Sequence, residues 1–233
     1  MVGAAQWLAA PGDPRQNLSV ALGMVENAAA RGVELLVLPE LWSCGYDPET
    51  LARDARRDAE PADGPRAAQL ADAARCHELF LAAGSVPELG EDGRLHETAL
   101  VFNPRGELVA RHRKTHLFPP TLEHSVFTPG DHLTTFADPA LALTNSQWWV
   151  QANQAGSHQT STLLGASRII APTGTVVAQA SAAMPGCASP AELLVHRIDL
   201  HIAHRREGAG ALLEEERRPA LYGDLVAPMT APR

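Results

Sequence analysis

The fold of this chain is indicated most clearly by one stretch of its sequence, VELLVLPELWSCGY at residues 33–46. The first six residues are apolar except for Glu34, as expected of a strand that is buried on both faces of a sheet. Pro39 and Glu40 end the apolar run, so a carboxylate follows the carboxyl end of a buried strand. Open α/β sheets commonly hold their ligands at that edge. The stretch therefore predicts an α/β fold with Glu40 close to a binding site.

The residues that precede this strand predict the rest of a β-α-β unit. Residues 2–8 form a short apolar segment, and apolar side chains recur at helical spacing over residues 18–30. A Pro-Gly-Asp-Pro turn at residues 11–14 precedes this helix, and Arg31-Gly32 ends it. A parallel pair of strands joined by a helix is the expected result.

The remainder of the chain continues as helices and strands. A second helix is expected over residues 64–77, followed by an apolar strand over residues 79–86. Further strands are expected at residues 96–102, 107–112, 147–152, 167–170, 175–180 and 193–198. No internal repeat or low-complexity linker interrupts the sequence. We therefore expect a single domain over residues 1–233, with a C-terminal tail from about residue 200.

Composition excludes several classes of protein. The 233 residues include 27 acidic and 19 basic side chains, a net charge of −8, with 45% hydrophobic and 20% charged residues. This is ordinary globular composition, and the net acidity argues against a nucleic-acid partner. No apolar run approaches the roughly 18 residues of a membrane span, and no secretory signal is evident. A cytoplasmic protein with neither a nucleic-acid nor a membrane partner is the expectation.

Three ionisable residues are candidates for chemistry. Glu40 follows a buried strand, so its carboxylate is expected to be partly desolvated, with a raised pKa that suits a general base; the alternative is a structural carboxylate that caps a helix or pairs with an arginine. Lys114 lies in the basic run at residues 111–116, where a solvated edge of a sheet is the alternative. Glu123 lies in a proline-rich loop, where a surface carboxylate is the default.

The three cysteines have no spacing typical of metal ligands, and reduced thiols are expected. Cys44 is either a thiolate near Glu40 or, more commonly for a free cysteine, a small buried hydrophobic residue. Cys76 falls within a helical pattern and is expected in the core, whereas Cys187 lies in a loop sequence. The ten histidines also lack ligand spacing, so neither a metal nor another cofactor is predicted.

Several motifs, in their usual order, resemble the nitrilase or carbon–nitrogen hydrolase superfamily, in its amidase-like branch. LPELWSCGY at residues 38–46 is similar to the glutamate motif of that family, and RKTHLF at residues 113–118 is similar to its lysine motif. Other similar segments are FTPGD at 127–131, ANQAG at 152–156, GASR at 165–168, PTG at 172–174 and RPALY at 218–222. The resemblance extends over about residues 2–224.

This resemblance implies a four-layer α-β-β-α sandwich, a homodimer, and hydrolysis of a nonpeptide C–N bond in an amide, carbamoyl compound or nitrile. The family uses a Glu-Lys-Cys triad, in which the cysteine forms a thioester that water then cleaves. Carried over by motif, Glu40 is the base, Lys114 stabilises the anionic intermediate, and Glu123 is the accessory carboxylate near the lysine. A cation beside a carboxylate is suited to both roles.

The nucleophile of the triad has no counterpart in this sequence. Only residues 133–146 separate the two segments between which the family carries its cysteine, and they contain none. The missing length is about one strand–helix unit, on the order of 30 residues. One central strand–helix unit is therefore predicted to be absent. Trp148 and Trp149, which follow, are expected to point to opposite faces of a strand.

Three hypotheses about function remain open from the sequence. The chain is a hydrolase by descent with doubtful activity, since only Glu40 and Lys114 of the triad are present. Alternatively, it is a catalytically inactive family member that acts as a binding or assembly protein. The third hypothesis is an active hydrolase that uses Cys44 as a substitute thiol.

Overall fold

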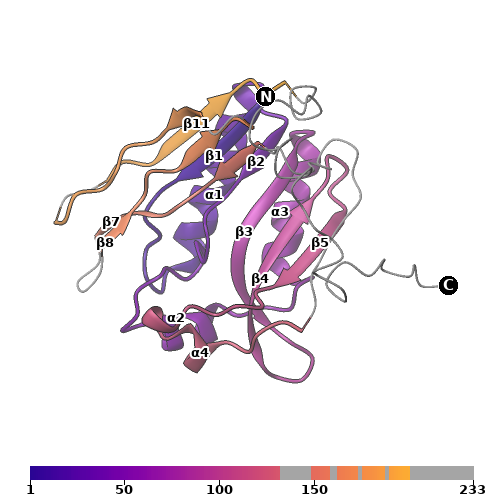
Figure 1. Ribbon diagram of the computed structural model, residues 1–233. Coiled ribbons are helices and arrows are strands. Elements are labelled where there is room, and N and C mark those ends of the chain that lie inside the picture. Colours follow the sequence, from indigo (N-terminus) through magenta and orange to yellow (C-terminus); the bar gives the residue numbers. More distant parts are fainter. Residues whose placement is uncertain (132–147, 158–161, 173–174, 187–188, 200–233) are drawn as a thin grey trace, which may run out of the picture.

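The computed structural model describes residues 1–131, 148–157, 162–172, 175–186 and 189–199. Its main sheet has six strands in the order β11-β1-β2-β3-β4-β5 (Figure 1). The strands are β1 (Val2–Gln6), β2 (Leu35–Val37), β3 (Phe80–Leu89), β4 (Leu95–Phe102), β5 (Leu108–Arg113) and β11 (Glu192–His196). Strands β1, β2 and β3 are parallel neighbours, and the other pairs are antiparallel. The predicted β-α-β unit is thus confirmed.

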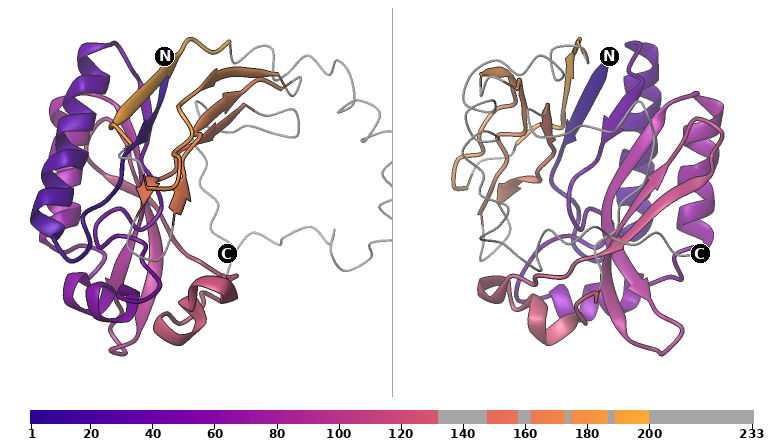
Figure 2. Two further views of the ribbon diagram at one scale, coloured as in Figure 1. Left: turned by 90° about the vertical axis from the view of Figure 1, so that its left-hand side faces the viewer. Right: turned by 45° about the vertical axis from the view of Figure 1, so that its right-hand side comes forward.

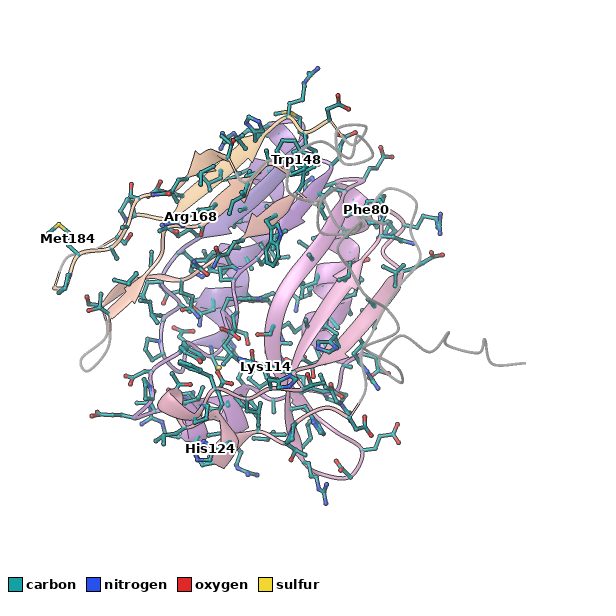
Figure 3. All side chains as sticks on the ribbon, viewed as in Figure 1. Phe80, Lys114, His124, Trp148, Arg168 and Met184 are labelled. Carbon is teal, nitrogen blue, oxygen red and sulfur yellow. The ribbon has the colours of Figure 1, made fainter. Side chains whose placement is uncertain are left out.

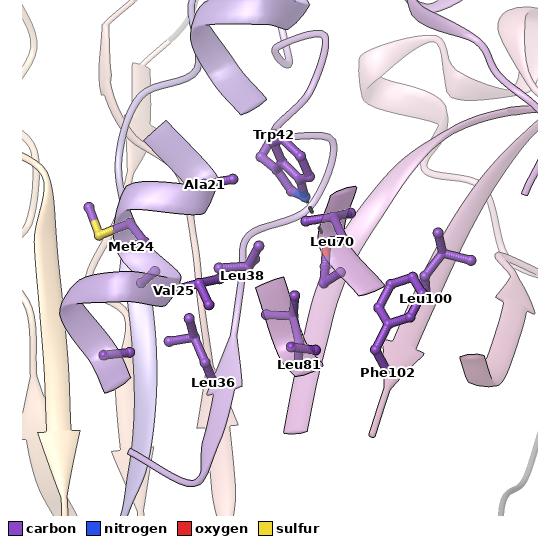
Figure 4. Close-up of a cluster of buried hydrophobic side chains, with 14 of the residues drawn as sticks. Ala21, Met24, Val25, Leu36, Leu38, Trp42, Leu70, Leu81, Leu100 and Phe102 are labelled. Carbon is purple, nitrogen blue, oxygen red and sulfur yellow. Dashed lines mark hydrogen bonds between the residues drawn. The ribbon is translucent and has the colours of Figure 1, made fainter. Parts of the chain in front are cut away.

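Two helices, α1 (Pro14–Ala30) and α3 (Pro65–Cys76), cover one face of the main sheet (Figure 2). Their apolar faces pack on side chains from the sheet in the largest core cluster, which Figure 4 draws. This cluster includes Ala21, Val25, Leu36, Leu38, Trp42, Leu70, Leu81 and Phe102. Burying apolar side chains between a helix layer and a sheet is the main source of stability in such a fold.

A second sheet packs against the opposite face of the main sheet (Figure 2). Its strands, in the order β10-β9-β6, are β6 (Trp149–Gln151), β9 (Arg168–Ile170) and β10 (Val176–Gln179). A short hairpin of β7 (Ala155–Ser157) and β8 (Thr162–Leu164) lies beside it. Val2, Trp148 and Ile169 form the core cluster between the two sheets. The described residues therefore form three successive layers, α-β-β; the predicted gap at residues 133–146 lies outside them.

The structure also has elements that the sequence did not indicate. Helix α2 (Leu51–Asp58) has the sequence LARDARRD, whose many charges hide its helical periodicity. The short segments η1 (Pro119–Thr121) and α4 (Glu123–Val126) follow β5, and β7 and β8 have only three residues each. Helix α1 begins four residues earlier than its apolar periodicity suggests, because Asp13 caps it by accepting a hydrogen bond from the Gln16 backbone N–H, at 3.1 Å.

Two expectations about single residues have different outcomes. Cys76 was expected in the core, and that prediction is wrong: it is the last residue of α3 and is exposed. The two tryptophans do differ as predicted, since Trp148 is buried whereas Trp149 at the start of β6 is 64% exposed.

None of the helices in the described residues has both the length and the apolar character needed to cross a bilayer.

Candidate functional site

The turn that follows β2 presents Glu40 at the edge of the main sheet. This turn packs directly on Gly84 of β3, where a Cβ atom would lie only 1.8 Å from the Pro39 carbonyl oxygen. Leu41, next to Glu40, has a left-handed backbone with φ of +46°, and its N–H donates to Ser85 Oγ at 3.0 Å. Ser85 lies where the register of the pairing between β3 and β4 shifts, between Ala82 and Ser85. Gly84 and Ser85 of β3 therefore hold in place the turn that carries Glu40.

Lys114 follows β5 directly and lies where the sheet meets the α2–α4 region (Figure 3). Its N–H donates to the Glu97 carbonyl oxygen at 2.8 Å, and its own carbonyl oxygen accepts from Gly130 at 2.9 Å. The ammonium nitrogen Nζ lies 2.7 Å from Glu40 Oε1, 2.9 Å from Glu123 Oε2 and 3.3 Å from Glu97 Oε2. The structure thus brings the three sequence-predicted residues together and adds a fourth, Glu97.

The lysine in this cluster stays protonated. Burial by itself lowers the pKa of Lys114, but the hydrogen bond with Glu40 and the negative charges of Glu97 and Glu123 outweigh it and leave the pKa above its usual value. The ammonium is therefore a permanent cation at the pH of a cell.

Glu123 is fully buried, not the surface carboxylate that its loop sequence suggests by default. One oxygen accepts from the Phe118 backbone N–H at 2.7 Å, and the other accepts from the Tyr46 hydroxyl. Burial raises the pKa of Glu123, but these hydrogen bonds and Lys114 outweigh burial and hold it below the usual value. Burial and the bond to Glu123 in turn raise the pKa of Tyr46, so its hydroxyl stays a donor. Glu123 is thus an ionised partner for Lys114.

Glu97 is the site residue that the sequence analysis missed. It lies in the middle of β4, its side chain is 2% exposed, and its Oε1 accepts from Ser85 Oγ at 2.8 Å. Burial, followed by the charge of Glu40, raises the pKa of Glu97 to about 8. The one sequence signal that could have indicated Glu97 is an acidic residue within a strand whose other residues are mostly buried.

The carboxylate of Glu40 is less buried than expected. Its side chain is 50% exposed, because the turn at Pro39 carries it out of the sheet. It lines a pocket of about 270 Å³ together with Tyr46, Asn153, Gln154, Thr162, Leu163, Leu164 and Gly165. Gln154, in the wall of the pocket, is connected to the turn after β2, because its Nε2 donates a hydrogen bond to the backbone carbonyl oxygen of Glu40 at 2.8 Å. Glu40 is the one charged residue among the described residues that line the pocket.

The described cysteines lie away from the pocket. Cys44 is buried among Leu41, Leu51, Ala55, Leu95 and Phe127. Its sulfur contacts the carbonyl oxygens of Leu41, at 3.9 Å, and Gly45, at 3.3 Å. Burial, followed by the charge of Asp58, raises the pKa of this thiol well above its usual value. Cys44 therefore matches the buried-hydrophobic interpretation, Cys76 is at the surface, and Cys187 lies outside the described residues.

The three carboxylates also have the spacing of metal ligands. One oxygen from each of Glu40, Glu97 and Glu123 lies within 4.8 Å of the others. Lys114 Nζ lies within 3.3 Å of an oxygen of each, so an ammonium group supplies the positive charge at this position. The ammonium of Lys114 therefore already neutralises part of the negative charge of the three carboxylates.

The α/β sandwich, and the contacts of Lys114 with Glu40 and Glu123, agree with what the sequence resemblance implies. The family model described as carbon-nitrogen hydrolase matches residues 1–143. The chain belongs to the carbon–nitrogen hydrolase family.

Curated relatives match about half of the chain. It is 33% identical over 124 residues to nitrilase homolog 2 of Dictyostelium discoideum, which is 50% of this chain and 37% of that protein. It is 35% identical over 131 residues to omega-amidase NIT2 of Mus musculus, which is 53% of this chain and 45% of that protein. The matches therefore span less than half the length of these relatives.

Solved structures match over nearly the whole chain. An amidase from Nesterenkonia sp. AN1 superposes with a TM-score of 0.71 and 21% identity, covering 97% of this chain and 96% of that one. Its structure carries the acetamide moiety of fluoroacetamide on the active-site cysteine. Nit3 of Saccharomyces cerevisiae superposes with a TM-score of 0.63 and 20% identity, covering 82% and 88%. These similarities confirm the nitrilase-type α/β fold.

Proposed function

We propose that this protein binds a small amide, carbamoyl compound or nitrile in the pocket beside Glu40, and that it does not hydrolyse the ligand through a covalent cysteine intermediate. The observation that carries the proposal is that Glu40, which lines this pocket, contacts Lys114 Nζ, which also contacts Glu123. A fixed ammonium and a half-exposed carboxylate are complementary to the C=O and N–H groups of an amide.

Each residue has a distinct role in the proposed site. The second oxygen of Glu40 accepts a hydrogen bond from the ligand, because Oε1 is already bound to Lys114. Lys114 provides positive charge where an amide oxygen would gain negative charge. Glu123 holds the lysine in place and, being buried and ionised, resists rearrangement. The roles of Lys114 and Glu123 follow the family resemblance, whereas Glu40, the base in the family, here only accepts a hydrogen bond.

The absence of covalent catalysis is proposed from the cysteines. Residues 133–146 contain no cysteine, and the thiol of Cys44 is buried with a raised pKa. A thiol that stays protonated is a poor nucleophile. Without a covalent intermediate, attack by water on an unactivated amide is expected to be very slow. Substitution of Cys44 for the family nucleophile is therefore the weaker hypothesis.

Ammonia release tests the catalytic part of this proposal. Folded, mass-verified protein is incubated with a panel of amides, carbamoyl amines and nitriles, beside Glu40→Gln and Cys44→Ala. The proposal predicts no ammonia above the Glu40→Gln background. Turnover that Glu40→Gln abolishes would contradict it, and loss of that turnover in Cys44→Ala would establish the substitute-thiol hypothesis.

We propose the organisation of the protein on two grounds. The family resemblance implies a homodimer, whereas the uninterrupted sequence and its composition indicate a single domain over residues 1–233 in the cytoplasm. Light scattering after size-exclusion chromatography measures the mass directly. A mass of twice the 24.8 kDa chain supports the dimer, and a mass equal to one chain contradicts it.

A further inference from the structure

Glu97 approaches Glu40 from a different part of the main sheet. It comes from β4, whereas Glu40 follows β2, and β3 lies between those two strands. An oxygen of each side chain lies within 4.8 Å of the other, and Lys114 contacts both. Glu97 is thus part of the cluster although it does not line the pocket.

The charges of the cluster do not balance if every carboxylate is ionised. Three carboxylates would then face one ammonium. Glu123 accepts several hydrogen bonds and is held ionised, while Glu40 is half exposed to water. Glu97 is buried, and its Oε2 has an ion pair with Lys114 at 3.3 Å but no hydrogen-bond partner among the described residues. A proton on Glu97 reduces the net charge of the cluster from −2 to −1 and turns this oxygen into a donor.

The other oxygen of Glu97 is connected to the backbone at Glu40. Ser85 Oγ donates to Glu97 Oε1 at 2.8 Å, and the same Ser85 oxygen accepts from the Leu41 N–H at 3.0 Å. Leu41 has a φ of +46°, a conformation that a leucine adopts only when its surroundings hold it there. Two hydrogen bonds therefore link Glu97 to the strained peptide that aims Glu40.

We propose that Glu97 is a positioning residue of this site, which carries a proton, donates it in a hydrogen bond to the Glu40 carboxylate, and fixes the Leu41 peptide through Ser85. This inference rests on the proposed function in one respect, that Glu40 receives the ligand. Glu97 itself contacts no ligand. It acts through Glu40, whose side chain it orients towards the pocket.

The proposal makes ligand binding depend on pH. The groups that face Glu97 are Glu40 from the turn after β2, Lys114 from the end of β5 and Ser85 from β3, with Glu123 of α4 beyond the lysine. When Glu97 loses its proton it repels Glu40 and competes for Lys114. With a pKa of about 8, the protonated fraction falls tenfold between about pH 7 and pH 9. Ligand affinity falls by the same factor, because only the protonated form holds Glu40 correctly.

A titration of the free protein tests the protonation without any ligand. The full chain is labelled with 13C at the glutamate side-chain carboxyl, and the carboxyl resonances are followed by NMR from pH 4 to pH 10. The expected result is one glutamate resonance that titrates near pH 8 and is absent from Glu97→Gln. The matched control is Glu107→Gln, in an exposed turn, which leaves this resonance unchanged. If no glutamate titrates above about pH 6 in the wild-type chain, the proposal is wrong, whether or not the variants fold.

Calorimetry then tests the effect on Glu40, with butyramide as the probe because it has no charge of its own between pH 7 and pH 9. Wild-type affinity is expected to fall about tenfold over that range, whereas Glu97→Gln, which keeps a donor at that position, binds equally at both pH values. Ser85→Ala is expected to weaken the binding of butyramide at both pH values. An affinity that does not change with pH in the wild type overturns the positioning role. If butyramide does not bind at all, the proposed function fails for this ligand, and the NMR titration still decides whether Glu97 is protonated.

Discussion

Lys114 Nζ lies 2.7 Å from Glu40 Oε1, although 74 residues separate the two in the sequence. Glu40 reaches this contact because the turn after β2 is locked onto β3, and Lys114 reaches it because its backbone is hydrogen-bonded to β4 and to the loop at Gly130. The contact therefore depends on the order of the strands in the sheet.

Removal of the lysine charge is expected to destabilise the protein. Lys114→Met leaves the buried, ionised Glu123 without its cation, at a cost of about 3 kcal/mol in the free energy of unfolding. Urea denaturation at pH 7 measures the change. The control is Arg105→Met, which removes an exposed pair with Glu107 and should cost less than about 1 kcal/mol. Equal effects of the two substitutions would show that the cluster contributes no stability.

Glu123 makes the stability of the protein depend on acid pH. Its pKa is lowered in the folded state, so it stabilises the fold above the pKa of the unfolded chain, about 4.3, and this contribution is lost as pH falls through the folded pKa. Wild-type protein should therefore lose more unfolding free energy than Glu123→Gln as pH falls below about 5. Denaturant titrations of both at several pH values give the comparison. If the difference in unfolding free energy between the two proteins stays constant with pH, the lowered pKa of Glu123 is contradicted.

The packing of the Glu40 turn on β3 requires a glycine at position 84. In Gly84→Ala the new Cβ would lie 1.8 Å from the Pro39 carbonyl oxygen, and the residue has a φ of +62°. The matched control is Gly93→Ala, with a φ of +75° but nothing within 4 Å of the new atom. The control should cost about 1 kcal/mol from backbone strain alone, and Gly84→Ala several times that, or prevent folding. Similar melting temperatures for the two variants would refute the close approach.

Cys44 is expected to act as a core residue and not as a nucleophile. Cys44→Ala should lower the free energy of unfolding by about 1 kcal/mol, because a small buried side chain is shortened. It should leave the binding of butyramide unchanged, since the thiol contacts backbone carbonyls and not the pocket. Calorimetry of this variant beside the wild type measures both affinities. Loss of binding at unchanged stability would place the thiol in the site.

The sequence predicted the elements whose periodicity is set by burial. Helices α1 and α3 and strands β1 to β5 were expected close to their observed positions, because each buries an apolar face or row. Helix α2 was missed because its charged residues mask its periodicity, and three-residue strands such as β7 carry too few side chains for a pattern. Cys76 was assigned to the core because it falls within a helical pattern, but it does not share the three- to four-residue spacing of the buried Ala67, Leu70 and Ala74.

The candidate site was only partly accessible from the sequence. Glu40 and Lys114 lie in motifs that follow apolar strands, and Glu123 was found through the same family motifs. Glu97 was missed because its role depends on which strand neighbours lie beside it, and strand order is not visible in one sequence. The exposure of Glu40 was misjudged for a related reason. The apolar strand before it indicated burial, but the turn at Pro39 carries the side chain to the pocket.

The most direct test of the proposed binding site is a calorimetric titration of the folded wild-type chain and of Glu40→Gln with butyramide at pH 7, with ammonia measured in the same samples. We expect saturable binding by the wild-type protein, no ammonia, and a loss of affinity of at least tenfold in the variant, which lacks the acceptor charge. Steady ammonia release that depends on Glu40 would contradict the proposed function, and so would equal affinity of the two proteins for the amide.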